Sequence, residues 1–113
     1  MKAIEQTDDH SSLSDKITRI CESADADGIA MSAFLNEEDV YLSELHRDPT
    51  AAPGLGRKYL DALVALAHAH AYPVHLCCTA WNSALVTYYE RAGFMQIYEK
   101  DEEVYMEASP VER

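Results

Sequence analysis

The chain has 113 residues, the length of one domain, and a formal net charge of −11 from 20 acidic and 9 basic side chains. This acidity argues against binding nucleic acid by phosphate neutralisation; it favours cationic partners or substrates, or serves only to keep the protein soluble. No apolar run is long enough to cross a bilayer and the first residues resemble no secretory signal, so we expect a cytoplasmic protein that does not bind membranes.

The three cysteines do not form a pattern typical of a disulfide framework or a metal site. Cys21 stands alone, and Cys77 and Cys78 are adjacent, whereas both kinds of site need characteristic paired spacings. We therefore expect reduced thiols and no bound metal. Because neighbouring residues on a strand point to opposite faces, at most one of Cys77 and Cys78 is expected to line a site.

The N-terminal region, residues 1–28, is expected to hold a short strand at residues 2–6 and one helix. Polar residues over 7–12 separate the two. Apolar side chains then recur at helical spacing, at Leu13, Ile17, Ile20 and Cys21. The aspartates and glycine over 25–28 end this helix.

Residues 29–108 alternate between strand and helix patterns. Strands are predicted at 29–35 and 40–46, joined by an acidic hairpin turn, and a loop with two prolines follows. A helix with a wide apolar stripe is predicted from Gly56 up to Pro73. The near-continuous apolar run 74–79 then predicts a central strand that is covered on both faces.

The last third of the chain predicts a second helix and a terminal hairpin. Asn82 or Ser83 is expected to cap this helix, and Gly93 to end it in the left-handed conformation. Alternating strands at 94–99 and 103–107 flank an acidic turn, which is either simply solvated or steers a cationic acceptor. Residues 109–113 are expected to form a loose tail.

The stretch Pro53-Gly54-Leu55-Gly56-Arg57-Lys58 is a candidate phosphate cradle. Two glycines let backbone N–H groups approach an anion without an intervening Cβ, and the following helix directs its unpaired N-terminal N–H groups to the same point. Strand, turn, helix and strand in succession predict a right-handed βαβ unit with parallel strands. The turn then lies at the carboxyl end of a strand, where α/β sheets bind ligands. A plain loop-to-helix junction is the alternative.

This turn and the later block Asn82-Ser83-Ala84-Leu85-Val86-Thr87-Tyr88-Tyr89-Glu90-Arg91-Ala92-Gly93-Phe94 together resemble the GNAT superfamily of acyl-CoA-dependent N-acetyltransferases. The turn is similar to the pyrophosphate loop of that family, and the block to its Asn…Tyr-Glu-Lys-x-Gly-Phe segment. The resemblance runs over residues 40–108. It implies a single α/β (α+β three-layer) domain over 1–113, with a reduced N-terminal region and a cofactor-binding core at 29–108. The implied core is a mixed central sheet with splayed parallel strands, helices on both faces and a C-terminal β-hairpin.

The resemblance also implies a binding site for acetyl-CoA between the splayed strands 40–46 and 74–79. Backbone N–H groups at the end of the first strand would hold the acetyl carbonyl, the turn would hold the pyrophosphate, and an asparagine would contact the pantetheine arm. The implied cofactor-binding residues are Leu45 and His46, then Gly54, Leu55, Gly56, Arg57 and Lys58, and finally Asn82.

The implied chemistry is direct transfer of an acetyl group to a primary amine. Tyr89 would protonate or hydrogen-bond the leaving CoA thiolate, whereas Tyr88 is expected to pack or to face the substrate. An amine that is protonated at neutral pH needs a base, and Glu44 and His46 are the candidates because their i, i+2 spacing puts them on one strand face. The acceptor would be a cationic small amine, a protein lysine or a protein N-terminus.

Two departures from the family pattern keep other functions open. Ala51 stands where the family has Arg or Gln, and Pro53 lacks a backbone N–H. Arg57 and Lys58 are expected to compensate for these missing groups by reaching the phosphates of the cofactor. The alternative function is a non-catalytic GNAT-like module that binds acyl-CoA or a protein, and an unrelated α/β interaction module is the third. The reduced N-terminal region leaves three alternatives for the acceptor pocket. The pocket is open, it is completed by a second subunit in a homodimer, or it is shaped for a protein side chain.

Overall fold

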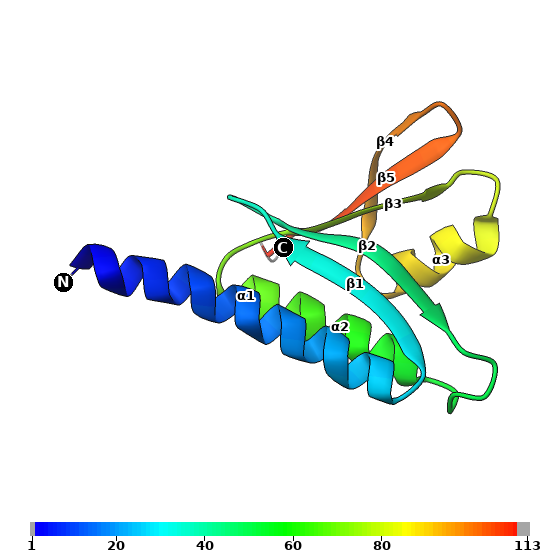
Figure 1. Ribbon diagram of the computed structural model, residues 1–113. Coiled ribbons are helices and arrows are strands. Elements are labelled where there is room, and N and C mark those ends of the chain that lie inside the picture. The colour runs from blue at the N-terminus through cyan, green and yellow to red at the C-terminus, as the bar shows by residue number, and fades with distance from the viewer. Residues whose placement is uncertain (1, 111–113) are drawn as a thin grey trace.

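The computed structural model of the protein describes the backbone of residues 2–110 and the side chains of residues 12–110. Three helices and five strands follow one another along the chain (Figure 1). In order they are α1 (Lys2–Ala26), β1 (Ile29–Leu35), β2 (Val40–Arg47), α2 (Leu55–Ala69), β3 (Val74–Thr79), α3 (Ser83–Arg91), β4 (Met95–Lys100) and β5 (Glu103–Ala108). Within residues 2–110, no helix combines the length and the apolar character that crossing a membrane requires.

The N-terminal region is one long helix, so the strand expected at residues 2–6 and the loop expected at 7–12 are wrong. α1 spans 25 residues and contains neither glycine nor proline. Its first residues include Lys2, Ala3, Glu5 and Gln6, which are strong helix formers, so the helix extends through the polar stretch. The apolar spacing that predicted the second half of α1 is confirmed, since Leu13 and Ile17 are buried in the core and Ile20 and Cys21 pack against it.

The five strands form one mixed sheet in the order β1-β2-β3-β5-β4. β2 and β3 are parallel and are connected by α2, and the other neighbours are antiparallel. The five strands predicted after residue 28 are all present, with bounds that differ from the expectation by at most one residue. The acidic turn of the terminal hairpin is also confirmed, with Asp101 and Glu102 at φ 54° and 69°.

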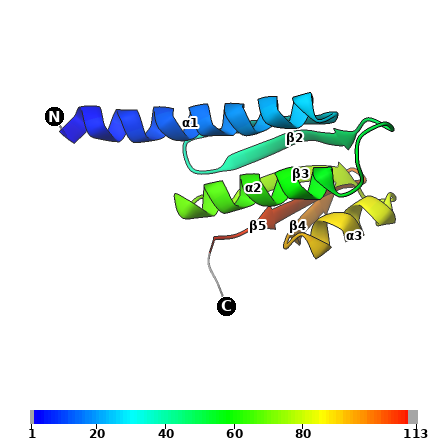
Figure 2. The same cartoon turned by 90° about the horizontal axis from the view of Figure 1, so that it is seen from below.

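All three helices lie on one face of the sheet, which corrects the expectation of helices on both faces (Figure 2). The connections β2–α2–β3 and β3–α3–β4 both lead in the same direction along the sheet. Crossovers of one hand that lead in one direction place their helices on the same face. The strand order that decides this cannot be seen in the sequence.

One set of alternating strand side chains is buried beneath the helices, and the other set faces the uncovered side. The buried set is Ile29, Met31, Val40, Leu42, Val74, Leu76, Cys78, Val104, Met106 and Ala108. β3 follows the same alternation, because His75, Cys77 and Thr79 are only half-buried. The prediction that β3 is covered on both faces is therefore wrong, although β3 is the central strand.

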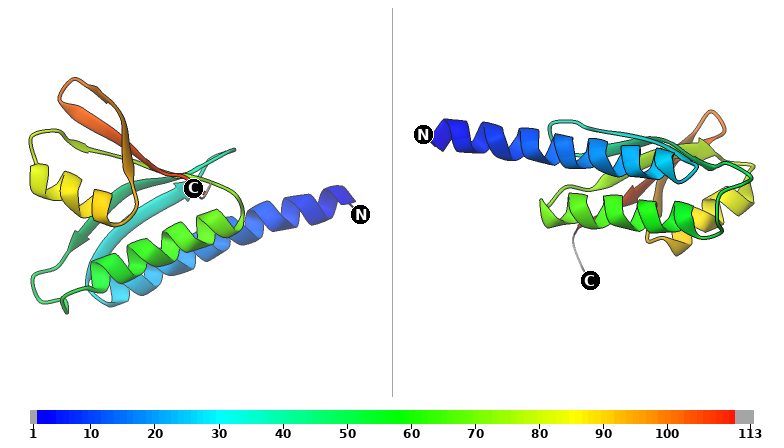
Figure 3. Two further views of the ribbon diagram at one scale, coloured as in Figure 1. Left: turned by 180° about the vertical axis from the view of Figure 1, so that it is seen from behind. Right: turned by 60° about the horizontal axis from the view of Figure 1, so that its bottom comes forward.

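β2 and β3 separate after two paired positions. Val40 pairs with Val74 and Tyr41 with His75, and no register continues beyond them within the described strands. Ser43 is an extra residue in β2, since Ser32 faces Glu44 while Ala33 faces Leu42. A bulge of this kind bends its strand and increases the local twist. β2 therefore turns away from β3 on the side where α3 lies, and the splayed strands are confirmed (Figure 3).

Candidate functional site

The gap between the splayed strands contains a cavity of about 250 Å³. Its walls are residues 42–45 of β2, residues 76–79 of β3, and Leu85 and Tyr89 of α3. Cys77 and Cys78 both line it, so the expectation that at most one of them lines a site is wrong. The cavity lies along the edge of β3 rather than over one face, and consecutive residues therefore border it.

A second cavity, of about 330 Å³, lies between the end of β2, the start of α2 and α3. It is lined by Leu45, His46, Arg47, Gly54, Gly56, Arg57, Leu85, Tyr88 and Tyr89. Leu45, Leu85 and Tyr89 border both cavities. The two spaces therefore adjoin, and together they lead from the strand gap to the N-terminus of α2.

The start of α2 offers uncapped backbone N–H groups to this second cavity. Gly54 is the N-cap residue with φ 86°, and neither a side-chain cap nor an acidic side chain occurs in the first turn. The first N–H groups of a helix have no intrahelical acceptors, and they lie at the positive end of the helix dipole. Because α2 begins at Leu55 rather than after Gly56, Pro53 lies outside the first turn. Its missing N–H is therefore not one of these groups.

Two arginines border the second cavity, and sequence reasoning singled out only one of them. Arg57 donates from Nε to Asp61 Oδ1 at 2.8 Å and from Nη2 to the carbonyl of Arg91 at 3.2 Å. Arg47, which the sequence did not mark, donates from Nη1 to the carbonyl of Ala51 at 3.1 Å. The guanidinium group of Arg47 is thus held beside Ala51, the position at which the GNAT pattern has Arg or Gln.

Lys58 and Asn82 do not line either cavity. The Nζ of Lys58 lies 5.5 Å from the centroid of the Tyr59 ring. Asn82 is the N-cap of α3, as predicted, and its Oδ1 accepts from the N–H of Leu85 at 3.2 Å. Its carboxamide nitrogen takes no part in this cap, so cofactor contacts of Asn82 and Lys58 stay predictions.

The alternation of β2 directs the backbone of Leu45 into the strand gap. The carbonyl of Gly28 accepts from the N–H of Asp48, which marks one hydrogen-bonded pair of β1 and β2. Such pairs alternate in an antiparallel ladder, so His46 bonds to β1 whereas Leu45 directs its N–H and C=O away from β1. Of the two amides expected at the acetyl carbonyl, only that of Leu45 therefore faces the gap.

Tyr89 stands at the junction of the two cavities. Its side chain is 6% exposed, and burial raises the pKa of its hydroxyl to about 12. Its ring packs edge-on against Tyr88 and Phe94, with centroid distances of 5.3 and 5.7 Å. Tyr89 is thus a neutral hydroxyl donor in a fixed orientation.

Glu44 and His46 form a hydrogen-bonded pair on the uncovered face of the sheet. Glu44 Oε2 lies 2.9 Å from His46 Nε2, which confirms that the two side chains share one strand face. The side chain of Glu44 is 50% exposed and that of His46 is 67% exposed. Glu44 borders the strand gap and His46 borders the second cavity.

The cysteines in the gap are neutral thiols. Burial, together with a hydrogen bond from Sγ to Glu103 Oε1 at 2.9 Å, raises the pKa of Cys77 to about 11. Burial also raises the pKa of Cys78. Because the thiolate is the nucleophilic form, neither cysteine is suited to covalent catalysis. Among the side chains that the structure describes, no group of three or more His, Cys, Asp or Glu could hold a metal ion.

Comparison with known proteins finds similar structures but no matching family model and no matching curated protein. The PaiA N-acetyltransferase from Thermoplasma acidophilum, solved with coenzyme A, matches with a TM-score of 0.62 at 17% identity, over 72% of this chain and 52% of that chain. A putative acyl-CoA N-acyltransferase from Klebsiella pneumoniae matches with a TM-score of 0.60 at 23% identity, over 74% of this chain and 63% of that chain. Naa50 from Arabidopsis thaliana, solved with the bisubstrate analogue CoA-Ac-MVNAL, matches with a TM-score of 0.57 at 17% identity, over 70% of this chain and 62% of that chain.

These similarities establish that the chain has the GNAT fold. The chain spans less than two thirds of the length of each of the three structures. At identities of 23% and below, the likeness is one of architecture, and activity has to be argued from the residues of the site.

Proposed function

We propose that this GNAT-fold domain transfers an acetyl group from acetyl-CoA to a primary amine by direct attack in a ternary complex. The observation that carries the proposal is the split between β2 and β3. This split opens a cavity that is bordered by the unpaired amide of Leu45 and by Tyr89, and it leads to the uncapped start of α2. Two of the similar structures contain CoA or a CoA conjugate, which supports acetyl-CoA as the donor.

The residues present fit the pyrophosphate, the pantetheine arm and the thioester of an acyl-CoA. The first N–H groups of α2 and the guanidinium groups of Arg47 and Arg57 would bind the phosphates. The strand gap, which is lined by leucines together with polar groups such as Ser43 and Thr79, would take the pantetheine arm and its amides. The N–H of Leu45 would donate to the acetyl carbonyl oxygen as negative charge develops there.

In the proposed reaction the amine nitrogen bonds to the carbonyl carbon, the carbon–sulfur bond breaks, and its electron pair leaves on sulfur. The amine proton passes to the Glu44–His46 pair, which faces the uncovered side of the sheet. Tyr89 donates a hydrogen bond to the departing sulfur. Moving its proton from a pKa of about 12 to a thiolate of pKa about 8.5 would cost about 5 kcal/mol. Tyr89 is therefore better suited to stabilising the thiolate than to surrendering its proton.

The acceptor is proposed to be a cationic amine, either a small molecule or a lysine or N-terminus of a protein. The net charge of −11 and the exposed carboxylate of Glu44 attract such amines. The cytoplasmic location stays a prediction, and so does the homodimer, which was one of three alternatives for the acceptor pocket.

Thermal unfolding with and without acetyl-CoA tests the donor site. Acetyl-CoA at about one hundred times its dissociation constant should stabilise the fold by about 2.7 kcal/mol. Adenosine, which lacks the pantetheine arm and the thioester, is the control and should stabilise it less. Acetylation of a panel containing spermidine, a lysine peptide and a peptide with a free N-terminus then tests transfer. An unchanged melting temperature at saturating acetyl-CoA would refute the proposal.

The second candidate is a module that binds acyl-CoA without transferring the acyl group. The exposure of Glu44 and His46 favours it, since a solvated pair lacks the burial that usually tunes a catalytic base. Stabilisation by acetyl-CoA without acetylation of any amine in the panel would select this candidate.

A further inference from the structure

β1 forms one end of the sheet and pairs only with β2 among the described strands. The alternation of this ladder is fixed at both ends, by the bond from the N–H of Asp48 to the carbonyl of Gly28 and by the bond from the N–H of Asn36 to the carbonyl of Asp39. By this alternation, every second residue of β1 directs its N–H and C=O away from the sheet. These residues are Ile29, Met31, Ala33 and Leu35.

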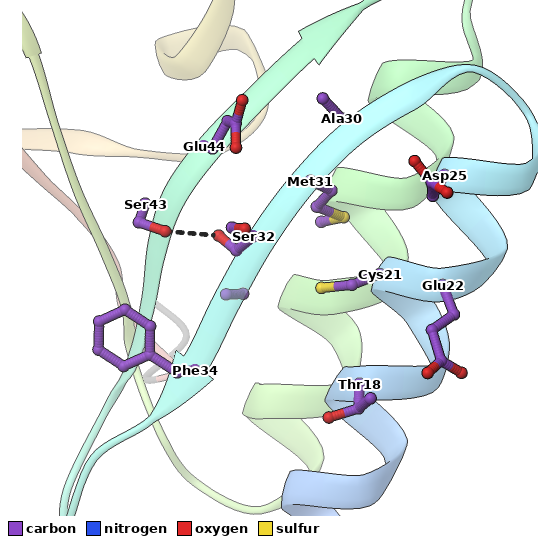
Figure 4. A pocket seen from close by; sticks show the side chains of 11 residues that line it. Thr18, Cys21, Glu22, Asp25, Ala30, Met31, Ser32, Phe34, Ser43 and Glu44 are labelled. Carbon is purple, nitrogen blue, oxygen red and sulfur yellow. Dashed lines mark hydrogen bonds between the residues drawn. The ribbon is translucent and has the colours of Figure 1, made fainter.

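A groove of about 600 Å³ runs between this outer edge and α1 (Figure 4). α1 contributes Thr18, Cys21, Glu22 and Asp25, and β1 contributes residues 30–34. Ser43 and Glu44 of β2 also line the space, from the other side of β1. The thiol of Cys21 lies by the N–H of Ala33; burial raises the pKa of this thiol, and the contact with that N–H opposes the rise. The N–H of Ala33 thus points into the groove, as the alternation requires.

The groove is acidic. Its lining includes the carboxylates of Glu22, Asp25 and Glu44 and no basic side chain. A second copy of this chain, at −11, would bring like charges together along the edge. A cationic chain would meet opposite charges from both α1 and β2.

We propose that this groove binds an extended, lysine- or arginine-bearing segment of another polypeptide, which adds to the outer edge of β1 as a further strand. Main-chain hydrogen bonds to the outward groups of Met31 and Ala33, the two outward residues that line the groove, supply affinity. The carboxylates of Glu22 and Asp25 select a cationic segment. The proposal needs neither the gap between β2 and β3 nor the start of α2, and of its acidic residues only Glu44 is shared with the proposed acetyl transfer.

Fluorescence anisotropy with the whole chain tests the charge requirement. The probe is a labelled peptide in which lysine and threonine alternate. It has about eight residues, which is within the usual length of a strand. It should bind, and a peptide of alternating glutamate and threonine should not. The double substitution Glu22→Gln and Asp25→Asn should weaken binding about tenfold, as expected for two exposed ion pairs.

The matched control is Glu37→Gln with Glu38→Gln, which makes the same charge change in the exposed β1–β2 turn, outside the groove. This control should change the affinity by less than about twofold. An equal loss in both double variants would show a general charge effect and overturn the groove as the binding site.

Peptide backbone changes and a chemical footprint test strand addition while the protein stays intact. The lysine–threonine peptide N-methylated at every residue keeps its charge but loses its donors, and it should bind at least about tenfold more weakly. The unmethylated peptide should also slow alkylation of Cys21, because Cys21 lines the groove. Equal affinity of the methylated peptide, or an unchanged alkylation rate with the peptide bound, would overturn the proposal. So would a dimer in sedimentation equilibrium that the Glu22 and Asp25 variants abolish.

Discussion

Tyr89 differs from its neighbour Tyr88 in burial and in the space it borders, although both are tyrosines of α3. Tyr89 borders both cavities, whereas Tyr88 borders only the cavity at the start of α2. The pKa of Tyr89 is raised to about 12 by burial, so its hydroxyl stays protonated throughout the usual assay range. Because Tyr89 alone borders the strand gap, we assign stabilisation of the thiolate to the hydroxyl of Tyr89 and not to that of Tyr88.

Substituting Tyr89→Phe removes that hydroxyl and keeps the ring. We expect kcat for acetyl transfer to fall about 10²- to 10³-fold, because one hydrogen-bond donor to developing charge is lost. The KM for acetyl-CoA and the melting temperature should change little, since the ring contacts with Tyr88 and Phe94 remain. Tyr88→Phe is the matched control and should keep most of the kcat. Full turnover in the Tyr89 variant would remove Tyr89 from the reaction.

Gly54 is held at φ 86°, and nothing lies within 4 Å of a Cβ built there. Gly54→Ala should destabilise the fold by about 1–2 kcal/mol, because a side chain strains this left-handed conformation. Relief of that strain would shift the start of α2 and should weaken acetyl-CoA binding. Urea unfolding and calorimetric titration measure the two effects.

Gly93 provides the control for Gly54, since it has φ 102°, equally open surroundings and a place outside both cavities. Gly93→Ala should cost about the same stability and leave acetyl-CoA affinity unchanged. A matching loss of affinity in both variants would mean that binding follows stability rather than the geometry of the α2 N-terminus.

At the scale of elements, the sequence predicted the order of strands and helices but not the feature that separates β2 from β3. Periodicity identifies a strand where one face is buried, as in β3 and β5. β4 is exposed along its whole length, and only its alternation of apolar and polar residues beside a turn predicted it. The bulge at Ser43 arises from a register shift between two strands, and no local pattern in 40–47 marks it. Arg47 was missed because only the fold brings it to the cavity between β2, α2 and α3.

The N-terminus of α3 separates two roles of Asn82, capping and cofactor contact. Asn82→Asp keeps the oxygen that accepts from the N–H of Leu85, so stability should stay within about 0.5 kcal/mol. It loses the amide donor and adds a negative charge, so acetyl-CoA affinity should fall if that amide contacts the cofactor. Asn82→Ala removes both and should also cost about 1 kcal/mol in chemical denaturation. Unchanged affinity in Asn82→Asp would leave Asn82 as a cap alone.

At the scale of the molecule, the sheet has one face beneath the helices and one uncovered face. The apolar run 74–79 suggested two covered faces, but His75, Cys77 and Thr79 can meet water or polar partners, so composition alone does not decide. The position of the helices follows from the strand order, which depends on contacts between distant residues. The uncovered face consequently carries the Glu44–His46 pair and a second histidine cluster.

That second cluster joins three parts of the sheet through His75 of β3. Its Nδ1 lies 2.6 Å from Asp39 Oδ2 in the β1–β2 turn, and its Nε2 lies 3.0 Å from Glu107 Oε2 of β5. Only an imidazolium donates from both ring nitrogens. Burial lowers the pKa of His75, but the hydrogen bonds and charges of Asp39 and Glu107 outweigh burial, so the pKa is raised overall.

A pKa raised in the folded state means that the cluster stabilises the fold fully below the unfolded value of about 6.5 and loses this contribution as pH rises through the folded value. His75→Gln should therefore lower the free energy of unfolding by about 1 kcal/mol at acidic pH and by less at alkaline pH, since all three side chains are partly exposed and screened. Urea unfolding of both proteins from pH 5.5 to 9 measures the difference. His46→Gln, which breaks one more exposed pair, should give a difference near zero at every pH. A difference for His75→Gln that grows with rising pH would mean that the neutral imidazole is the form that stabilises the fold.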